Sequence, residues 1–231
     1  MSLIVALLPT VCKHIAKRRG MRYNKGRPPP DAAAYPFLQC SIDKEVFDMS
    51  KAVVFLAPGS EECEALLVVD ILRRAGVEVT VAAVGGDKTV VTSHKVSVTA
   101  DALASQIDPA DYDACVLPGG IPGVNNLAAD PDVRRVCDAC NAAGKRVAAI
   151  CAAPTVLGGF GLLKGRKATV YPGMDDGLTG ATHTGDEVTV DGNITTGRAL
   201  GAAIPFALKL AEQLAGKEAS DRVRKAIVYP Y

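Results

Sequence analysis

The sequence predicts an α/β fold in which helices cover both faces of a mainly parallel sheet. Continuous apolar runs of four to six residues, typical of strands buried on both sides, alternate along the chain with segments of helical periodicity. Glycine-containing turns separate these segments, and the sequence has no internal repeats or heptads. Such alternation is typical of parallel strands that are connected through helices.

The first strand and the first helix of the predicted domain are defined most clearly. Residues 52–57 form an apolar run and predict a buried strand. Ser60 is the predicted N-cap of the following helix, and Glu61 and Glu62 favour the positive end of its dipole. Gly76 is predicted to end this helix, because glycine readily adopts the left-handed conformation of a C-terminal cap.

The rest of the domain continues the alternation of strands and helices. A helix is also expected directly after Cys151, where the chain leaves a buried strand. The other predicted elements are strands at 77–84, a short strand pair within 90–98, strands at 114–117 and 146–150, a helix at 132–143, strands at 168–171, 187–190 and 193–196, and a helix at 199–214.

Composition and charge limit the class of protein. The 231 residues are enough for one domain with a hydrophobic core, and 48% hydrophobic residues exclude a disordered chain. No apolar run approaches the ~18–20 residues of a membrane-spanning helix. Residues 1–30 carry seven basic residues and no acid, whereas residues 49–231 carry 18 basic and 21 acidic residues. The domain therefore lacks the positive charge expected of a nucleic-acid-binding protein.

Residues 1–48 are interpreted as a basic N-terminal leader and residues 49–231 as the folded domain. The apolar residues 1–12 precede the basic cluster, which is the reverse of the order in a secretory signal. An acid-free, arginine-bearing start suits a mitochondrial-type transit peptide. Alternatively, the leader is an extension without function, because Met49 opens a complete domain by itself. The two interpretations predict a mitochondrial and a cytoplasmic location, respectively.

The cysteines favour a reducing compartment, because their number is odd and their spacing irregular. Cys137 and Cys140 lie near the buried face of a predicted helix, and no second Cys or His pair stands nearby to complete a zinc site. No metal centre is therefore predicted. The seven cysteines are Cys12, Cys40, Cys63, Cys115, Cys137, Cys140 and Cys151.

Three features of the sequence are expected at one edge of the sheet. Glu64 lies in the first turn of the first helix, Gly119 and Gly120 follow the strand at 114–117, and Cys151 follows another strand. Ligands of open α/β sheets bind at the carboxyl ends of the strands, where these features are expected to lie.

Cys151 is the candidate nucleophile. A cysteine at a sharp strand-to-helix turn has the geometry of a nucleophile elbow, and the helix N-terminus is expected to lower its thiol pKa. The backbone N–H groups of Gly120 and Ala152 are then candidates for an oxyanion hole. The alternative is a small buried side chain without chemistry. Neither His94 nor His183 is positioned by the sequence as a base for Cys151.

Four segments together resemble the ThiJ/PfpI superfamily, in particular its Parkinson-disease-protein (DJ-one) branch. The resemblance covers about residues 50–231. The cysteine motif and the Pro-Gly-Gly motif are specific in combination. The segments are Ala-Pro-Gly-Ser-Glu-Glu-Cys-Glu-Ala at 57–65, Arg-Arg-Ala-Gly at 73–76, Leu-Pro-Gly-Gly at 117–120 and Ala-Ala-Ile-Cys-Ala-Ala-Pro at 148–154.

The resemblance implies a flavodoxin-like three-layer sandwich, similar to class I glutamine amidotransferases, and a homodimer. It implies that Cys151 is a nucleophilic, oxidation-prone cysteine and that Glu64 hydrogen-bonds its sulfur. The backbone of Gly119, Gly120 and Ala152 would line the pocket. Tyr171 and Arg198 are candidates for its rim.

The sequence also departs from the family pattern. Tyr171 stands where many members have a histidine, and Ala152 stands where the protease-like branch has one, so neither a Cys-His dyad nor peptidase activity is supported. His94 replaces the arginine usual in the short strand pair. Arg198 matches a Thr-x-Arg segment, but Ala-Leu-Gly at 199–201 replaces the usual Gly-Pro-Gly.

Two functions follow from the resemblance. The first is a glyoxalase III or deglycase that converts methylglyoxal, glyoxal or their early adducts through Cys151, with no metal or other cofactor. The second is a redox-sensing stress chaperone that acts through oxidation of Cys151 without turnover. A nucleotide-binding module is weakly supported, because no Gly-x-Gly-x-x-Gly follows the first strand.

Overall fold

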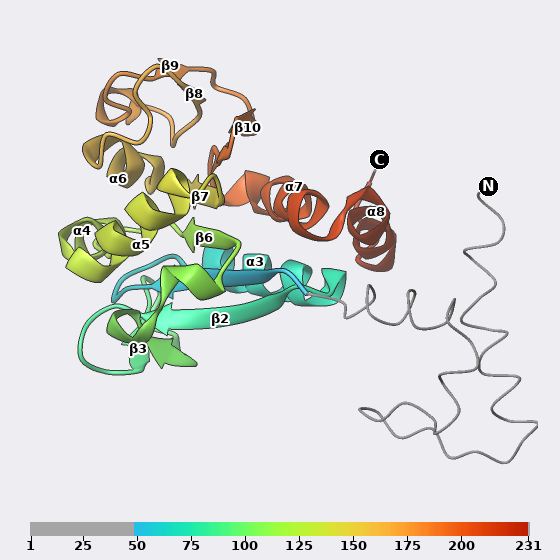
Figure 1. Cartoon of the computed structure of the whole chain (residues 1–231), viewed down its shortest axis with the longest axis horizontal. Coiled ribbons are helices and arrows are strands. Elements are labelled where there is room, and N and C mark those ends of the chain that lie inside the picture. Colours follow the sequence, from blue (N-terminus) through green and yellow to red (C-terminus); the bar gives the residue numbers. More distant parts are fainter. Residues whose placement is uncertain (1–48, 231) are drawn as a thin grey trace, which may run out of the picture. The chain divides into compact units, whose positions relative to one another are not determined.

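The computed structural model describes residues 49–230, so the predicted leader at residues 1–48 lies outside the described residues. The centre of the domain is a seven-stranded sheet of order β10-β11-β7-β6-β1-β2-β5 (Figure 1). Every neighbouring pair is parallel except β10 and β11. The predicted α/β fold with a mainly parallel sheet is therefore confirmed.

Six of the seven strands of the central sheet lie close to the predicted ranges, and the short strand at Ala102–Leu103 was not predicted. Two smaller sheets are formed by β3 (Thr89–Val91) with β4 (Ser97–Thr99) and by β8 (Lys167–Ala168) with β9 (Thr182–His183). The strands of the central sheet are β1 (Lys51–Leu56), β2 (Glu78–Ala83), β5 (Ala102–Leu103), β6 (Ala114–Leu117), β7 (Arg146–Ile150), β10 (Val188–Asp191) and β11 (Ile194–Gly197).

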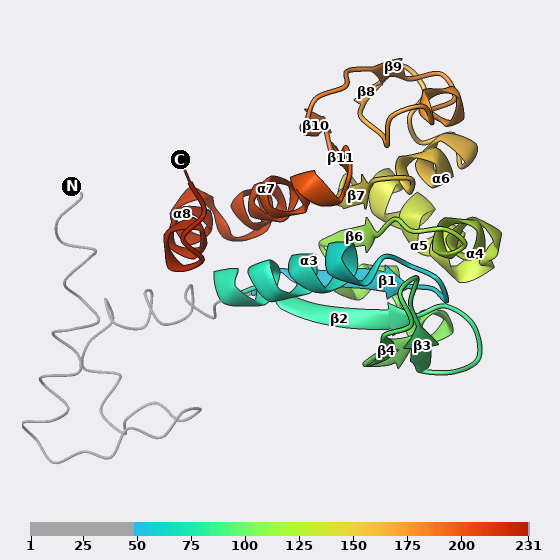
Figure 2. The same cartoon turned by 180° about the vertical axis from the view of Figure 1, so that it is seen from behind.

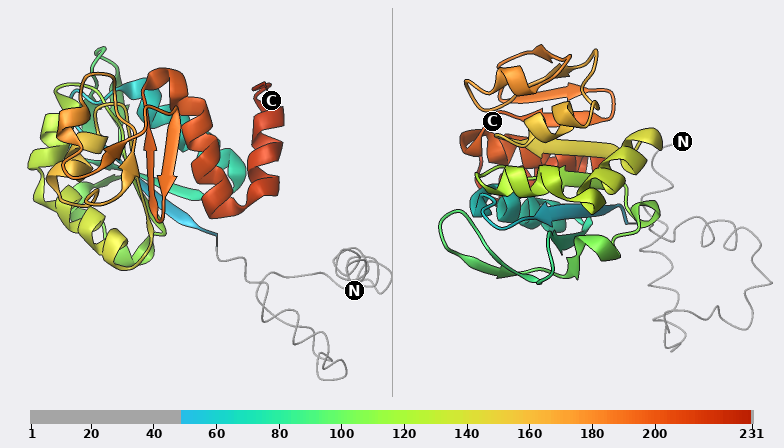
Figure 3. Two further views of the ribbon diagram at one scale, coloured as in Figure 1. Left: turned by 90° about the horizontal axis from the view of Figure 1, so that it is seen from above. Right: turned by 90° about the vertical axis from the view of Figure 1, so that its left-hand side faces the viewer.

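Helices cover both faces of the sheet, as Figures 2 and 3 show. One layer contains α3 (Glu62–Ala75), α7 (Ala203–Ala215) and α8 (Lys217–Ala226). The opposite layer contains α4 (Gly123–Ala129), α5 (Pro131–Ala142) and α6 (Pro154–Gly159). The 3-10 turns are η2 (Ala104–Gln106), η3 (Pro109–Asp111), η4 (Asp175–Gly177) and η5 (Leu200–Ala202).

Strand β1 shows why the sheet needs a helical layer on each side. Val54 and Leu56 pack into the core beneath α3 and α7, whereas Val53 and Phe55 pack into the core on the other face. All four side chains are fully buried, because successive residues of a strand point to opposite faces. The continuous apolar run in the sequence is thus the consequence of two cores that share one sheet.

The ends of α3 include one correction to the sequence prediction. Ser60 is not the N-cap: its Oγ accepts a hydrogen bond from Ala57 N at 3.1 Å and closes the turn after β1. Glu61 caps the helix instead, and its side chain accepts from Cys63 N at 3.4 Å. Gly76 ends the helix as predicted, with a φ of 91°.

The strand predicted at residues 168–171 is shorter, because β8 ends at Ala168. Thr169 N donates to Thr196 Oγ1 at 2.9 Å, and Thr169 Oγ1 donates to Asp186 O at 2.8 Å. These side-chain hydrogen bonds replace a strand ladder beyond Ala168. The connection leads the chain to Cys151, directly after β7, where Tyr171 N donates to Cys151 O.

Cys137 and Cys140 lie on the buried face of α5, as predicted, and both are fully buried. Cys115 Sγ of β6 lies 3.9 Å from Cys137 Sγ. These thiols therefore belong to the core between α5 and the sheet. In the part of the chain that the structure describes, no helix is both long and apolar enough to cross a membrane.

Candidate functional site

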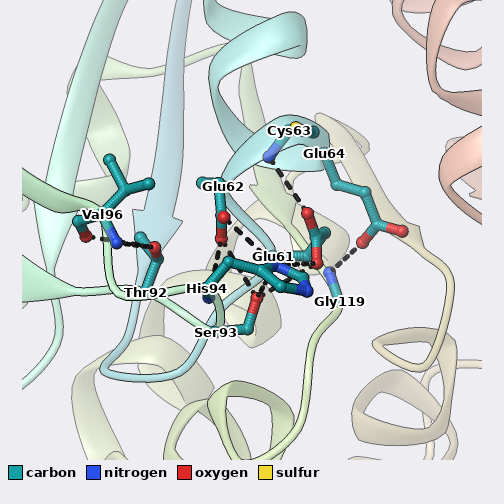
Figure 4. Close-up of polar contacts among 9 residues, drawn as sticks. All are labelled: Glu61, Glu62, Cys63, Glu64, Thr92, Ser93, His94, Val96 and Gly119. Carbon is teal, nitrogen blue, oxygen red and sulfur yellow. Dashed lines mark hydrogen bonds and ion pairs between the residues drawn. The ribbon is translucent and has the colours of Figure 1, made fainter.

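The sheet order brings three chain turns together at one edge. Strand β6 lies between β1 and β7, and all three run in the same direction. The segment after β1 carries Glu64, the segment after β6 carries Gly119, and the segment after β7 carries Cys151. Gly119 N donates to Glu64 Oε2 at 2.8 Å (Figure 4), and Glu61 N donates to Gly119 O at 2.9 Å. The topology thus places the three predicted features side by side.

Cys151 lies at a sharp turn between β7 and α6. Its φ is 64°, a left-handed conformation that costs a residue with a side chain roughly 1–2 kcal/mol. Two backbone hydrogen bonds hold it there: Cys151 N donates to Gly197 O at 2.9 Å, and Tyr171 N donates to Cys151 O at 2.8 Å. Such strain is typical of a nucleophile elbow, and the thiol is only partly buried.

Gly119 and Gly120 permit the close approach of these turns. A Cβ at position 119 would lie 2.5 Å from Glu64 Oε2 and 2.6 Å from Cys151 Cβ. Gly120 has a φ of +89°, and a Cβ there would collide with the backbone of Glu61. The glycines therefore determine how closely the carboxyl group and the sulfur can lie.

Substitution of Gly119 by alanine should destabilise the domain. Because neither Glu64 nor the Cys151 backbone can move freely, we expect a loss of about 1–3 kcal/mol in the free energy of unfolding. The matched control is Gly159→Ala in α6, where a Cβ meets nothing within 4 Å. It should be neutral or stabilising by up to about 1 kcal/mol. Urea unfolding of both variants measures the difference, and equal stabilities would contradict the steric argument.

The Glu64 carboxyl group is an almost fully buried acid without a basic partner among the described residues. Glu64 is 1% exposed, and its Oε1 atom has no hydrogen-bond partner in the described structure. Burial raises the pKa of Glu64 to about 7, although hydrogen bonds from Cys151 and from Gly119 N lower it. A carboxyl group of this kind both gives and takes a proton near neutral pH.

The thiol of Cys151 differs from the sequence prediction. Burial and the neighbouring Glu64 raise its pKa to about 12, and the N–H groups of Ala152 and Gly120 lower it by a smaller amount. The prediction of a lowered pKa is therefore wrong, because it considered the helix N-terminus and neither the burial of the thiol nor the adjacent carboxylate. The same contacts place the predicted N–H groups of Gly120 and Ala152 at the sulfur.

Sequence reasoning missed a polar cluster beside this site, drawn in Figure 4. Ser93 Oγ lies within hydrogen-bond distance of both Glu61 Oε2 and Glu62 Oε2, at 3.1 Å each, and His94 Nδ1 lies 3.4 and 3.1 Å from the two carboxylates. The pKa of Glu62 is lowered to about 2, because hydrogen bonds from its own N–H, Thr92, Ser93 and His94 N outweigh its burial. No sequence motif relates residues 61–62 to residues 93–94. The β3–β4 hairpin brings the two pairs together in the folded chain.

The two predicted rim residues differ in position. Tyr171 lies next to Cys151, because its backbone N–H donates to Cys151 O. Tyr171 is 48% exposed. The Arg198 guanidinium instead donates to Gly185 O at 3.1 Å and lies 3.9 Å from Glu187. It is thus engaged by the segment that precedes β10. His183 is exposed on β9, as expected for a polar segment.

The geometry defines an α/β protein with a cysteine at a nucleophile elbow and a buried acid beside it. The sequence model of the DJ-1/PfpI family matches residues 50–213. The chain therefore belongs to the DJ-1/PfpI family, as the motifs predicted.

The comparisons with individual proteins agree with this assignment. Protein dj-1beta of Drosophila melanogaster is 42% identical over 186 residues, which cover 79% of this chain and 100% of that protein. The Danio rerio Parkinson disease protein 7 homolog is 36% identical over 182 residues, covering 77% and 96%. A Caenorhabditis elegans relative, described as the glutathione-independent glyoxalase DJR-1.2, is 29% identical, covering 76% and 95%.

Solved structures show the same fold. The crystal structure of Drosophila melanogaster DJ-1beta has a TM-score of 0.76 and 41% identity, covering 79% of this chain and 100% of that one. A structure of Toxoplasma gondii DJ-1, described as oxidized, also has a TM-score of 0.76, with 39% identity and the same coverage. The flavodoxin-like three-layer fold predicted from the sequence is therefore confirmed.

Proposed function

We propose that the chain is a cofactor-independent glyoxalase that converts methylglyoxal to lactate and glyoxal to glycolate, or acts on their early adducts as a deglycase. The observation that carries this proposal is the pairing of Cys151, held at a strained turn, with Glu64, whose pKa of about 7 suits a general base at neutral pH. The glyoxalase relative in Caenorhabditis elegans supports it.

In the first step the Cys151 sulfur adds to the aldehyde carbon of methylglyoxal. As the C–S bond forms, the thiol proton passes to the Glu64 carboxylate, and the carbonyl π electrons move to oxygen. The N–H groups of Gly120 and Ala152 hold the negative charge that develops there. Return of the proton gives a hemithioacetal. A free thiolate is not required, which agrees with the raised pKa of Cys151.

In the second step Glu64 moves one proton within the bound adduct. Its carboxylate removes the proton from the former aldehyde carbon, while the hydroxyl proton of that carbon passes to the neighbouring ketone oxygen. The resulting enediolate forms a carbonyl at the first carbon as Glu64 returns its proton to the second carbon. The first carbon is thereby oxidised and the second reduced, so the thioester of lactate forms without an external oxidant. Water then hydrolyses the thioester, which releases lactate and restores the thiol.

The test is lactate formation by the purified full chain in a buffer free of amines, thiols and added metal. Without an added amine or thiol, only the free dicarbonyl is available as substrate. We expect lactate to accumulate catalytically, well beyond one equivalent per chain. Accumulation only after an amine or thiol is added would identify the adduct as the substrate, and its absence under both conditions would contradict the proposal.

A redox-sensing function is the second candidate, and the Glu64 Oε1 without a partner favours it. Peroxide oxidises a thiolate first to sulfenate and then to sulfinate, with one water formed from each peroxide. A protonated Glu64 would donate to a sulfinate oxygen. The oxidized Toxoplasma gondii relative supports this candidate. If it holds, intact mass after peroxide treatment shows a gain of two oxygens on Cys151, and Glu64→Gln changes that gain; an unchanged gain would contradict this candidate.

The predicted homodimer also forms part of the proposal. Leu66 on α3 and Val91 and Val96 on the β3–β4 hairpin are each at least 39% exposed, which suits a surface covered by a partner. Light scattering of the purified chain distinguishes a dimer from a monomer. The cytoplasmic or mitochondrial location also remains a prediction.

A further inference from the structure

The cluster formed by Glu61, Glu62 and His94 has the composition and size of a metal site. One carboxylate oxygen from each glutamate and one imidazole nitrogen lie within 4.8 Å of one another. The three residues come from two separate elements, the start of α3 and the β3–β4 hairpin. Imidazole and carboxylate ligands in combination are typical of zinc and its neighbours in the first transition series.

The charges in this cluster are unbalanced. The side chains of Glu61 and Glu62 are only 13% and 11% exposed, yet they lie side by side. Among residues 49–230, His94 is the one basic side chain within 4.0 Å of either carboxylate, so at most one positive charge faces two negative ones. Buried charges are ordinarily paired or bound to a metal.

The hydrogen bonds do not resolve this imbalance. Ser93 Oγ lies 3.1 Å from Glu61 Oε2, from Glu62 Oε2 and from His94 Nδ1. A hydroxyl group has one hydrogen to donate, so Ser93 satisfies at most one of the two carboxylates. Backbone groups add further donors, because Cys63 N donates to Glu61 Oε1 and His94 N donates to Glu62 Oε2, both at 3.4 Å. These neutral donors stabilise the carboxylates but leave one of the two negative charges without a cationic partner.

The separations between the candidate ligands also fit a small cation. Two ligands of a tetrahedral zinc ion, each about 2.0–2.1 Å from the metal, lie about 3.3 Å apart. His94 Nδ1 lies 3.4 Å from Glu61 Oε2 and 3.1 Å from Glu62 Oε1. The His94 side chain is 70% exposed, which leaves room for water as a fourth ligand. Mg²⁺ and Ca²⁺ fit less well, because they prefer oxygen ligands throughout.

We propose that Glu61, Glu62 and His94 bind one Zn²⁺ ion, with water as the fourth ligand. The ion would join the β3–β4 hairpin to the first turn of α3, the helix that also carries Glu64. This inference does not depend on the proposed glyoxalase activity, because none of its ligands takes part in the chemistry derived for Cys151.

Calorimetric titration of the full chain with Zn²⁺ tests this site. We expect one site per chain whose affinity falls at least about 10-fold in His94→Ala, a change at an exposed side chain that should not affect folding. His183→Ala, at the exposed histidine of β9, is the matched control and should bind normally. His14→Ala should also bind normally and tests the third histidine of the chain. Glu61→Gln should weaken binding.

Cobalt substitution distinguishes this site from one at Cys151. A Co²⁺ ion bound by nitrogen and oxygen alone shows no thiolate charge-transfer band, whereas coordination by cysteine produces one. We expect no such band in the wild-type chain. A band that disappears in Cys151→Ser, zinc affinity that is unchanged in His94→Ala, or no zinc binding at all would each overturn the proposal.

Discussion

Replacement of Cys151 by serine is expected to lower kcat/KM for methylglyoxal at least about 1,000-fold. The sulfur forms the covalent bond in every step derived above, and loss of a catalytic nucleophile typically costs this much or more. A serine hydroxyl is a far weaker nucleophile at neutral pH, and Glu64 with a pKa near 7 cannot ionise it. Lactate formed per unit time, measured over a range of methylglyoxal concentrations, gives the ratio.

The matched control is Cys63→Ser. Cys63 is exposed in the first turn of α3, close to the site in sequence but on the solvent side. Its substitution should leave kcat/KM within about 2-fold of the wild type, because surface substitutions rarely affect structure. The proposed activity is excluded if Cys151→Ser retains wild-type turnover, or if Cys63→Ser loses as much activity as Cys151→Ser.

Most of the fold was predictable from the sequence, because burial on two faces leaves a strong local signal. The apolar runs in β1, β6 and β7 are short and bounded by turn residues, which favours a doubly covered strand over a buried helix. The errors arose where side chains compete with the backbone for hydrogen bonds. Ser60 closes a turn and does not cap α3, and Thr169 bonds to Thr196 and ends β8 early.

The candidate site was predictable in position but not in its electrostatics. Cys151, Glu64 and Gly119 each follow directly from a strand end or helix start, so topology alone brings them together. The raised pKa of Cys151 depends on how closely the Glu64 carboxyl group lies, which no single segment encodes. His94 likewise reaches Glu61 and Glu62 only because the β3–β4 hairpin folds back over α3.

Glu64→Gln should change turnover and thiol reactivity in opposite directions. Removal of the acid–base group should lower kcat by about 100- to 10,000-fold. The carboxylate raises the pKa of Cys151, so its removal should lower that pKa and increase the thiolate fraction at pH 8. Iodoacetamide should therefore alkylate Cys151 faster in the variant, with its rate midpoint at lower pH. If both alkylation and turnover slow, Glu64 does not act as proposed and the substitution has distorted the elbow.

The same substitution should remove a pH-dependent part of the stability. Glu64 has a pKa of about 7 when folded against a reference value of 4.5, so between these values the folded chain holds a proton that the unfolded chain has lost. The stability contributed by this proton is complete below pH 4.5 and is lost as the pH rises through 7. About 2.5 pKa units at about 1.4 kcal/mol each give a loss of about 3 kcal/mol.

Urea unfolding of wild type and Glu64→Gln at pH 5 and pH 8 measures this effect. Glutamine retains an oxygen that accepts from Gly119 N but cannot ionise, so the variant should gain about 2.5 kcal/mol relative to the wild type between pH 5 and pH 8. Histidines and surface carboxylates titrate in both proteins, so their contributions cancel in the difference. An equal pH dependence in the two proteins would show that Glu64 is already ionised at pH 5, and a base with so low a pKa could not relay the proton of Cys151.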